Sequence, residues 1–255
     1  MDKLSERQKQ ILDKAKKKGR VVVDQLSNFF NVSPQTIRKD INELCNKQLL
    51  QRVHGGAIVG SSIENLDYEA RKLLAPEGKI AIGKRAAELI PNNCSLFINI
   101  GTTTEQVARE LANHRGIMAI TNNIKTIEIL RSSPGIELLI AGGVVRRSDG
   151  GIVGVAAVDF INQFKVDYAI IGVSAIDEEG LLLDYDLSEV RVAQAIIKNS
   201  RHVIMVADMM KLSRSAPVRI GHISQIDTLV IDGKPSDNFC TLCKENEVVI
   251  EIALP

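Results

Sequence analysis

The chain has 255 residues, of which 45% are hydrophobic and 25% charged, values ordinary for a soluble globular protein with room for one small and one medium domain. Its net charge is only +1, but residues 1–58 carry 12 Lys or Arg against 6 Asp or Glu, whereas the rest of the chain carries 20 against 25. A basic N-terminal segment followed by an acidic remainder predicts a polyanionic partner for the N-terminal segment.

Targeting segments and metal motifs are weak or missing in the sequence. No run approaches membrane-spanning length, and Met1 to Glu6 contain no apolar signal core. We therefore expect a cytoplasmic protein with no membrane partner. The four cysteines are Cys45, Cys94, Cys240 and Cys243, and the last two lack a second pair or a suitably spaced histidine. We interpret that pair as reduced thiols on a surface or half-buried helix, and we expect no metal and no cofactor.

Two helices are expected at the start of the chain. The first begins with a capping-box pattern, Ser5 to Gln8, continues with an apolar stripe, and ends at Gly19. A short extended piece at residues 21–23 precedes a second helix from about Asp24 to Phe30. Asn31 and Val32 then form a tight turn into a third helix, which gives a helix-turn-helix arrangement.

The third helix has the features of a DNA-reading helix. Ser33 is a good N-cap, Pro34 suits the first helical position, and Ile37, Ile41 and Leu44 recur at helical spacing. Its other face carries side chains that can hydrogen-bond base edges and neutralise phosphates, namely Gln35, Thr36, Arg38, Lys39 and Asn42. Taken alone, these residues would equally suit a solvated amphipathic helix.

The residues after the third helix favour the DNA-binding interpretation. Two short extended runs, residues 49–53 and 57–59, are joined by His54-Gly55-Gly56, as in the wing of a winged helix-turn-helix. Arg52 and His54 are placed to reach the backbone or the minor groove. The candidate DNA-binding residues are Ser33, Gln35, Thr36, Arg38, Lys39, Asn42, Arg52 and His54.

The remainder predicts a second, α/β domain. Residues 59–76 are interpreted as a linker and a bridging helix from about Leu66 to Leu74, and residues 77–255 as the second domain. There, helical stretches alternate with apolar runs, as a parallel sheet covered on both faces requires. The expected strands are Leu96–Ile100, Ile117–Ile120, Glu137–Ala141, Tyr168–Gly172, Val203–Ala207, Thr228–Ile231 and Val248–Ile252.

Small polar residues follow several of these strands, and ligands of such sheets bind beyond the carboxyl ends of the strands. Gly101 and three threonines precede a helix expected from about Glu105, an arrangement that can bind an anion through backbone N–H groups. Nearby cations suit phosphate and carboxylates suit hydroxyls, although each could equally form a surface ion pair. The candidate effector-binding residues are Lys79, Gly101, Thr102, Thr103, Thr104, Thr121, Asn122, Asn123, Gly142, Gly143, Ser174, Glu189, Asp208 and Lys211.

The sequence resembles the DeoR family of bacterial transcription regulators. The likeness is carried by residues 36–41 and 52–57 in the first domain, and by Thr121-Asn122-Asn123 and residues 149–154 in the second. It implies a winged helix-turn-helix joined to a Rossmann-like sensor domain that shares its fold with ribose-5-phosphate isomerases. The family usually has two arginines where this chain has Arg38-Lys39, so we assign Lys39 to the DNA backbone and not to a base.

The resemblance implies a repressor that binds double-stranded operator DNA, acts as a homo-oligomer (dimer or tetramer) and has no catalytic residues. It is closest to members that regulate glycerol 3-phosphate metabolism, which implies glycerol 3-phosphate as the effector. Met209 and Met210 stand where relatives often carry His and Ser, a departure next to the effector residues. The alternatives are an activator and a phosphosugar isomerase-like enzyme with an accessory DNA-binding domain, in which Asp208 and Lys211 could transfer protons.

Overall fold

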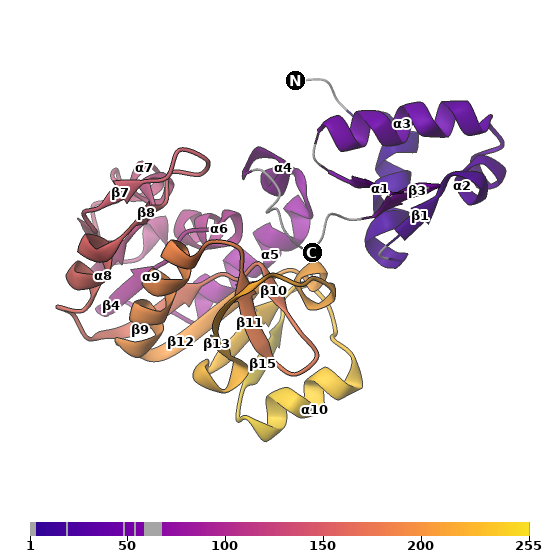
Figure 1. Cartoon of the computed structure of the whole chain (residues 1–255). Coiled ribbons are helices and arrows are strands. Elements are labelled where there is room, and N and C mark those ends of the chain that lie inside the picture. The colour runs from indigo at the N-terminus through magenta and orange to yellow at the C-terminus, as the bar shows by residue number, and fades with distance from the viewer. Residues whose placement is uncertain (1–3, 19, 48, 54, 59–67, 255) are drawn as a thin grey trace. The chain divides into compact units, whose positions relative to one another are not determined.

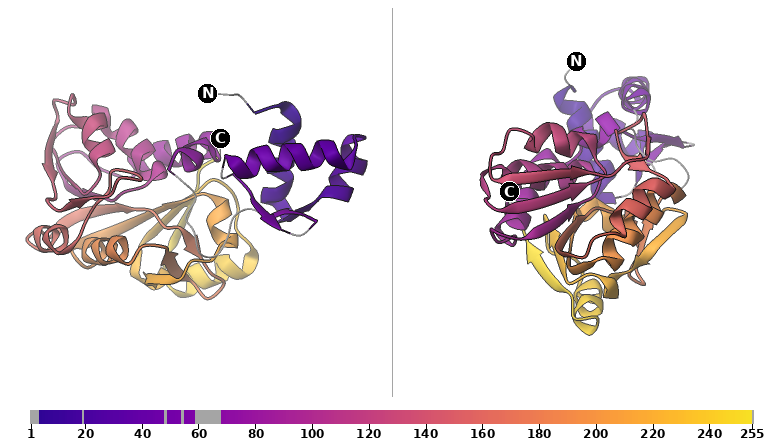
Figure 2. Two further views of the ribbon diagram at one scale, coloured as in Figure 1. Left: turned by 45° about the horizontal axis from the view of Figure 1, so that its top comes forward. Right: turned by 90° about the vertical axis from the view of Figure 1, so that its left-hand side faces the viewer.

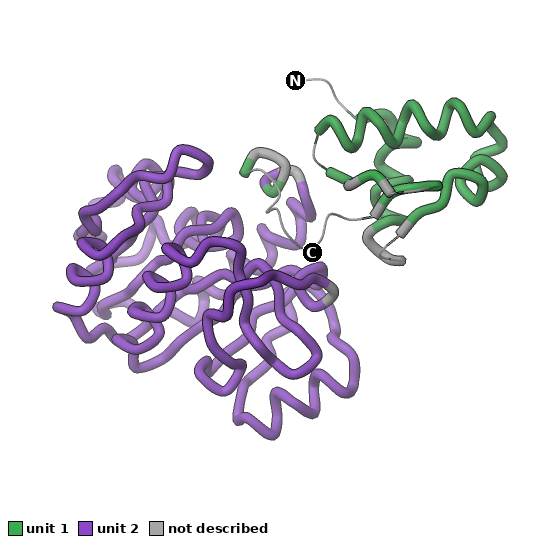
Figure 3. The backbone as a smooth tube through the Cα atoms, viewed as in Figure 1, with its two compact units in different colours: residues 1–71 green, residues 72–255 purple. Residues whose placement is uncertain are grey.

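The computed structural model describes residues 4–18, 20–47, 49–53, 55–58 and 68–254. The chain divides into two compact units, Met1–Arg71 and Lys72–Pro255 (Figures 1 and 3). Within the described ranges, no helix has both the length and the apolar character needed to cross a bilayer.

Unit 1 is a helix-turn-helix followed by a wing. Its elements are α1 (Glu6–Lys18), β1 (Arg20–Val22), α2 (Val23–Phe30), α3 (Pro34–Asn46), β2 (Gln51–Val53) and β3 (Gly56–Ile58). The capping box is confirmed, because the backbone N–H of Ser5 donates to Gln8 Oε1 and that of Gln8 donates to Ser5 Oγ. Asn31 takes the left-handed conformation (φ 50°) that the turn between α2 and α3 requires.

The wing of unit 1 has one strand more than expected. The extended piece at residues 21–23 is β1, which pairs antiparallel with β3, so that the sheet has the order β1-β3-β2. Helix α2 consequently begins at Val23, one residue earlier than predicted, since Val22 ends the strand. The last residue of the predicted strand 57–59 and the first two of the bridging helix lie outside the described residues, and α4 covers Tyr68–Leu73.

Polar contacts fix the orientation of α1 against α3. The apolar stripes of both helices are buried, as Ile11, Ile37 and Leu44 show. Beside them, the Arg7 guanidinium pairs with the buried Asp40 carboxylate at 2.5 Å, and Gln8 Nε2 donates to Glu43 at 2.5 Å. Because a buried carboxylate is costly without a partner, these contacts hold α3 in one orientation and leave its other face exposed.

Unit 2 is built on a seven-stranded parallel sheet with the order β15-β14-β12-β9-β4-β5-β6. All seven expected strands are confirmed, with ends that differ by at most three residues. They are β4 (Ser95–Ile98), β5 (Ile117–Thr121), β6 (Ile136–Ile140), β9 (Val166–Ile171), β12 (Ser200–Ala207), β14 (Thr228–Ile231) and β15 (Val249–Ile252).

Helices cover both faces of this sheet (Figure 2). Successive residues of a strand point to opposite faces, so Leu96 and Ile98 join one core and Phe97 joins the other. Helices α5 (Pro76–Glu88) and α6 (Thr102–Glu110) pack in the first core, and α8 (Val155–Ile161), α9 (Leu187–Lys198) and α10 (Asp237–Glu245) pack in the second. Helix α7 (Ile124–Leu130) follows β5.

Two small antiparallel sheets were not predicted. One has the order β10-β11-β13 and consists of β10 (Ala175–Ile176), β11 (Leu181–Asp184) and β13 (Val218–His222). The other is the hairpin of β7 (Val144–Val145) and β8 (Ile152–Val153). Short 3-10 turns cover Leu111–Asn113, Met209–Ser213 (η2) and Ile223–Gln225. Both small sheets arise in stretches that connect the long strands.

Two local expectations need correction. Helix α6 begins at Thr102 and not near Glu105, because Gly101 takes a backbone conformation (φ 145°, ψ 148°) from which the helix starts at the next residue. The two C-terminal cysteines lie on α10 as expected, but Cys243 is fully buried, and burial raises the pKa of its thiol to about 11. Among the described residues, no group of His, Cys, Asp and Glu could hold a metal ion.

Candidate functional site

The exposed face of α3 carries the candidate DNA-binding side chains. The Ser33 hydroxyl accepts from the Thr36 N–H at 3.2 Å and contacts the Thr36 hydroxyl at 2.9 Å, so both residues also cap the helix. Gln35, Arg38 and Lys39 are exposed. Burial of the opposite face against α1 and α2 therefore leaves two adjacent cations and a glutamine in solvent.

The wing lies against the same helix. Arg52 of β2 donates to the side-chain amide oxygen of Asn42 on α3, so these two candidates are brought together. Arg38, Arg52 and Asp24 border a hollow of about 330 Å³ that also reaches the glycine turn of the wing. His54 lies outside the described residues.

At the carboxyl end of β4, the chain turns into α6 with buried threonines. Thr102 and Thr103 each expose only 7% of their surface. Thr104 is committed to the turn itself, because its hydroxyl donates to the carbonyl oxygens of Asn99 and Gly101, both at 2.8 Å. The first two threonines, in the first turn of a helix whose N-cap is a glycine, are the better candidates for ligand contact.

The neighbouring strand β5 ends in a polar turn that is equally buried. The Thr121 hydroxyl donates to the Ile98 carbonyl at 2.6 Å, and Asn123 caps α7 through Lys125 N–H and donates to Glu105 at 3.3 Å. Asn122 donates from its side chain to the Ile152 carbonyl at 3.1 Å. Its amide oxygen is buried and has no hydrogen-bond partner in the described part of the chain. These residues join β4, β5 and the β7–β8 hairpin at one edge.

A second polar group lies at the ends of β12 and β14. Asp208 and Lys79 are buried there, and Asp232, which was not predicted, accepts from the Met209 N–H at 2.7 Å. Burial raises the pKa of Asp232, the Asp208 charge raises it further, and the Met209 N–H and the Lys79 charge oppose the rise. A Cβ at Gly78 would lie 2.1 Å from Asp232, so only glycine lets α5 approach this carboxylate.

The remaining candidates have distinct positions. Ser174 donates to the buried carboxylate of Asp184 at 3.0 Å, a residue that sequence reasoning missed. Gly142 and Gly143 are both exposed, but Gly143 has a φ of 151° and a Cβ there would lie 2.7 Å from the Val153 carbonyl oxygen, whereas a Cβ at Gly142 would meet no atom within 4 Å. Lys211 lies in η2 and its N–H donates to the Asp208 carbonyl at 2.9 Å.

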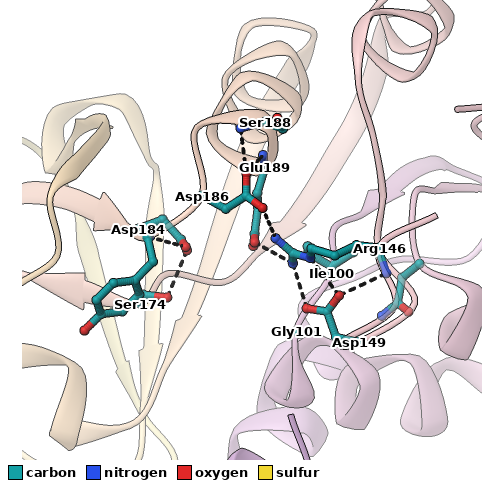
Figure 4. A network of polar contacts seen from close by, with 12 residues as sticks. Ile100, Gly101, Arg146, Asp149, Ser174, Asp184, Asp186, Ser188 and Glu189 are labelled. Atoms are coloured by element: carbon teal, nitrogen blue, oxygen red, sulfur yellow. Dashed lines mark hydrogen bonds and ion pairs between the residues drawn. The ribbon is translucent and has the colours of Figure 1, made fainter. Parts of the chain in front are cut away.

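The densest set of charges at this edge surrounds Arg146, which sequence reasoning also missed (Figure 4). Its guanidinium bonds Asp149 through Nε at 2.9 Å and Nη2 at 2.6 Å, Asp186 through Nη1 at 2.9 Å, and Glu189 through Nη2 at 2.6 Å. The Arg146 side chain is 18% exposed and that of Asp149 is 7% exposed. One cation thus joins the β7–β8 turn to the start of α9.

The charges of this network reinforce one another. Burial lowers the pKa of Arg146, but its carboxylate partners outweigh that effect and raise it, so the guanidinium stays charged. Burial raises the pKa of Asp186, and the hydrogen bonds from Arg146 and from the N–H groups of Ser188 and Glu189 bring it below its ordinary value. The only sequence signal for this network was Asp149-Gly150-Gly151, a turn pattern with no partner visible in the sequence.

Comparison with known proteins places the chain in a family. A family model described as "DeoR-like helix-turn-helix domain" matches residues 7–62, and one described as "DeoR C terminal sensor domain" matches residues 75–233. The chain belongs to the DeoR family. Both candidate regions described above fall within the residues that the two family models match.

Relatives of the same length are repressors by name. The glycerol-3-phosphate regulon repressor of Escherichia coli (strain K12) is 42% identical to this DeoR-family chain over 250 residues, which cover 98% of this chain and 99% of that protein. The protein of the same name from Haemophilus influenzae is 44% identical over 233 residues, 91% of each chain.

Solved structures show more distant likeness. A translation initiation factor from Pyrococcus horikoshii OT3 aligns over 82% of this DeoR-family chain and 81% of its own, with a TM-score of 0.45 and 15% identity. Ribose 5-phosphate isomerase from Plasmodium falciparum aligns over 53% and 52%, with a TM-score of 0.40 and 17% identity. Both similarities are too low to bear on function.

The charge of Asp186 makes a testable contribution to stability. Asp186→Asn keeps an N-cap for α9 but loses the charged bond to Arg146, so we expect it to lower the free energy of unfolding by about 1 kcal/mol at pH 7. Because the folded-state pKa of Asp186 lies below its ordinary value of 3.8, this difference is present above that pH and disappears as the pH falls through the folded-state pKa.

Urea unfolding of the wild type and the variant across that pH range measures the difference. Asp237→Asn, at an exposed first-turn position of α10, is the matched control and should change stability by no more than about 0.5 kcal/mol. A difference for Asp186→Asn that stays constant down to the acid limit would contradict the assignment.

Proposed function

We propose that this DeoR-family chain is a cytoplasmic transcriptional repressor, released from operator DNA by a phosphorylated small molecule. Residues 1–58 would bind the DNA, residues 77–255 would bind the effector, and residues 59–76 would join them. The observation that carries the proposal is the match to both DeoR domains in a chain that aligns nearly end to end with named repressors. The exposed cations of α3 and the buried polar edge of the large sheet support it independently.

DNA binding would divide between base contacts and backbone contacts. Arg38 has the planar fork that matches guanine, whereas Lys39 suits a phosphate. Arg52, on the wing beside Asn42, would extend the contact from α3 to the neighbouring backbone or minor groove. Since each neutralised phosphate releases counterions, affinity should fall steeply with salt.

The effector would be glycerol 3-phosphate, which the names of the relatives suggest. Its phosphate suits the backbone N–H groups and the Thr102 and Thr103 hydroxyls at the start of α6. Its hydroxyls suit carboxylates such as Glu189 and Asp208, which are buried at the same sheet edge.

Release requires that the effector bind the DNA-incompetent arrangement more tightly. A coupling free energy of about 1–3 kcal/mol would change operator affinity by about 5–150-fold. A homo-oligomer, either a dimer or a tetramer, would place two copies of α3 on a two-fold operator one helical turn apart. The alternative is a transcriptional activator, because repression or activation depends on where the operator lies relative to the promoter.

A specific observation keeps an enzyme as the second candidate. The buried Asp208 and Lys79 and the half-buried Asp232 form a titratable group, and the pKa of Asp232 is raised. Such groups can transfer protons, as an isomerase-like enzyme would require. Their hydrogen bonds to the η2 backbone also explain them as structural, since Asp208 caps η2 and Asp232 accepts from Met209 N–H.

Arg38 is expected to contact a DNA base directly. Arg38→Ala is expected to weaken binding to a duplex that the wild-type chain has selected from a random pool, by about 1–3 kcal/mol, because a bidentate guanine contact is lost. A gel-shift titration measures this. Lys9→Ala, which removes one cation from α1 where it pairs with Glu6, is the matched control and should weaken binding much less. Equal affinity of Arg38→Ala and the wild type would remove Arg38 from the interface.

The second prediction concerns the α6 turn. The double variant Thr102→Ala, Thr103→Ala should bind the selected duplex normally but need about tenfold more glycerol 3-phosphate for release, because hydrogen bonds to a charged group are lost. Thr241→Ala, on the exposed side of α10, should respond like the wild type. A double variant released at the wild-type concentration would place the phosphate elsewhere.

The third prediction separates the regulator from the enzyme. The full chain incubated with triose, pentose and hexose phosphates should show no isomerisation by NMR. Steady turnover that Asp208→Ala abolishes would favour the enzyme.

A further inference from the structure

The Arg146 guanidinium is held as a fork by Asp149, a residue of its own turn. Two of its nitrogens, Nε and Nη2, bond the two Asp149 oxygens at 2.9 and 2.6 Å, which is the parallel geometry that arginine also uses for phosphate. The remaining contacts, to Asp186 and Glu189, come from α9 and orient the guanidinium from another element. Arg146 therefore has one edge held by α9 and one edge occupied by a carboxylate from its own turn.

This carboxylate lies next to the start of α6. A Cβ at Gly151 would lie 3.3 Å from Asp149 Oδ1 and 3.0 Å from the Ile100 side chain, so both border the same glycine. Figure 4 shows Ile100 and Gly101 beside the Asp149 carboxylate. The helix that follows has no side-chain cap at Gly101, and the Asp149 carboxylate lies near the side chain of Ile100, the residue before that glycine.

A separate observation points to a hydroxyl-bearing ligand at the same turn. The Asn122 side chain is fully buried, and its amide nitrogen donates to the Ile152 backbone carbonyl. The Ile152 N–H donates in turn to the backbone carbonyl of Asn122 at 2.7 Å, and not to its side chain. Its amide oxygen has no donor within the described residues. Buried acceptors are normally satisfied, and a ligand hydroxyl would satisfy this one.

We propose that, without effector, the Asp149 carboxylate occupies the position of the effector's phosphate. Arg146 would bind that phosphate when the effector displaces the Asp149 carboxylate. The inference rests on the proposed function for the identity of the effector, a polyol phosphate. A phosphate and the Asp149 carboxylate cannot share this position, because two anions would face one fork. Exchange replaces one charged bidentate bond by another, so Arg146 keeps its charge and its α9 partners.

The exchange would also change the structure of the turn that contains Asp149. Asp149 closes a tight turn in which the Arg146 N–H donates to the Gly151 carbonyl at 2.8 Å and the Gly150 N–H donates to the Arg146 carbonyl at 2.9 Å. The same turn is tied to the start of α7, because the Ile124 N–H donates to the Gly150 carbonyl at 3.3 Å. Displacing Asp149 therefore changes the β7–β8 hairpin and its contacts with the neighbouring polar turn.

The test is a calorimetric titration of the full chain with inorganic phosphate and with glycerol 3-phosphate. Asp149→Asn removes the competing charge while keeping a side chain of the same shape, so it should bind both anions about tenfold more tightly than the wild type. Asp237→Asn is the matched control, because it removes an exposed carboxylate of α10 that takes no part in the Arg146 network. It should bind neither anion more tightly. Arg146→Lys, which keeps the charge but loses the fork, should bind both about tenfold more weakly.

Thermal unfolding of each variant shows whether it is folded, and the gain expected for Asp149→Asn cannot come from unfolding. An equal gain in both Asp variants would show a general charge effect and overturn the proposal. Loss of affinity in Asp149→Asn, or no phosphate binding by any variant, would also overturn it. If Asp149→Asn gains phosphate affinity but glycerol 3-phosphate does not release DNA from the wild type, the anion site stands and the proposed effector fails.

Discussion

A guanidinium that is largely removed from solvent must keep its acceptors, and this requirement on Arg146 organises the sheet edge that we assign to the effector. Asp149, Asp186 and Glu189 satisfy it from two elements, the β7–β8 turn and α9. Breaking a buried ion pair by removing one partner is costly, whereas exchanging one anion for another is not. A site built in this way is stable without ligand and yet offers an anion a place to enter.

The parallel sheet explains why these groups meet. Strands β4, β5, β9 and β12 all point the same way, so the turns after them lie at one edge although they are far apart in sequence. The hydroxyls of Thr104 and Thr121 are used by the protein's own backbone, which makes the edge rigid. In unit 1, likewise, the Arg7–Asp40 ion pair fixes the orientation of α3, and the cationic face of that helix stays exposed.

Much of the fold could be read from the sequence. Apolar runs bounded by polar turns predicted the seven strands of the large sheet, and helical spacing with clear caps predicted α1 and α3, because these signals are local. The sequence could not show that Arg146 meets Asp186 and Glu189, some 40 residues later, or that Asp232 reaches α5, since such pairs exist only in the folded chain. Strand β10 has only two residues, and β11 and β13, although as long as β4 and β5, lie in the irregular stretches that connect the strands of the large sheet. Topology therefore predicted the sheet edge at which these candidate residues gather, but the pairing of Arg146 with its carboxylates needed the structure.

We propose that an anion bound in unit 2 lowers the affinity of unit 1 for DNA. Fluorescence anisotropy of a labelled duplex, selected by the full chain itself, tests this directly when the complex is titrated with glycerol 3-phosphate and, separately, with glycerol. We expect a complex that weakens as salt is raised and that glycerol 3-phosphate dissociates, whereas glycerol, which lacks the phosphate, does not. A chain that ignores duplex DNA even in dilute buffer, or a complex that responds equally to both compounds, would contradict it.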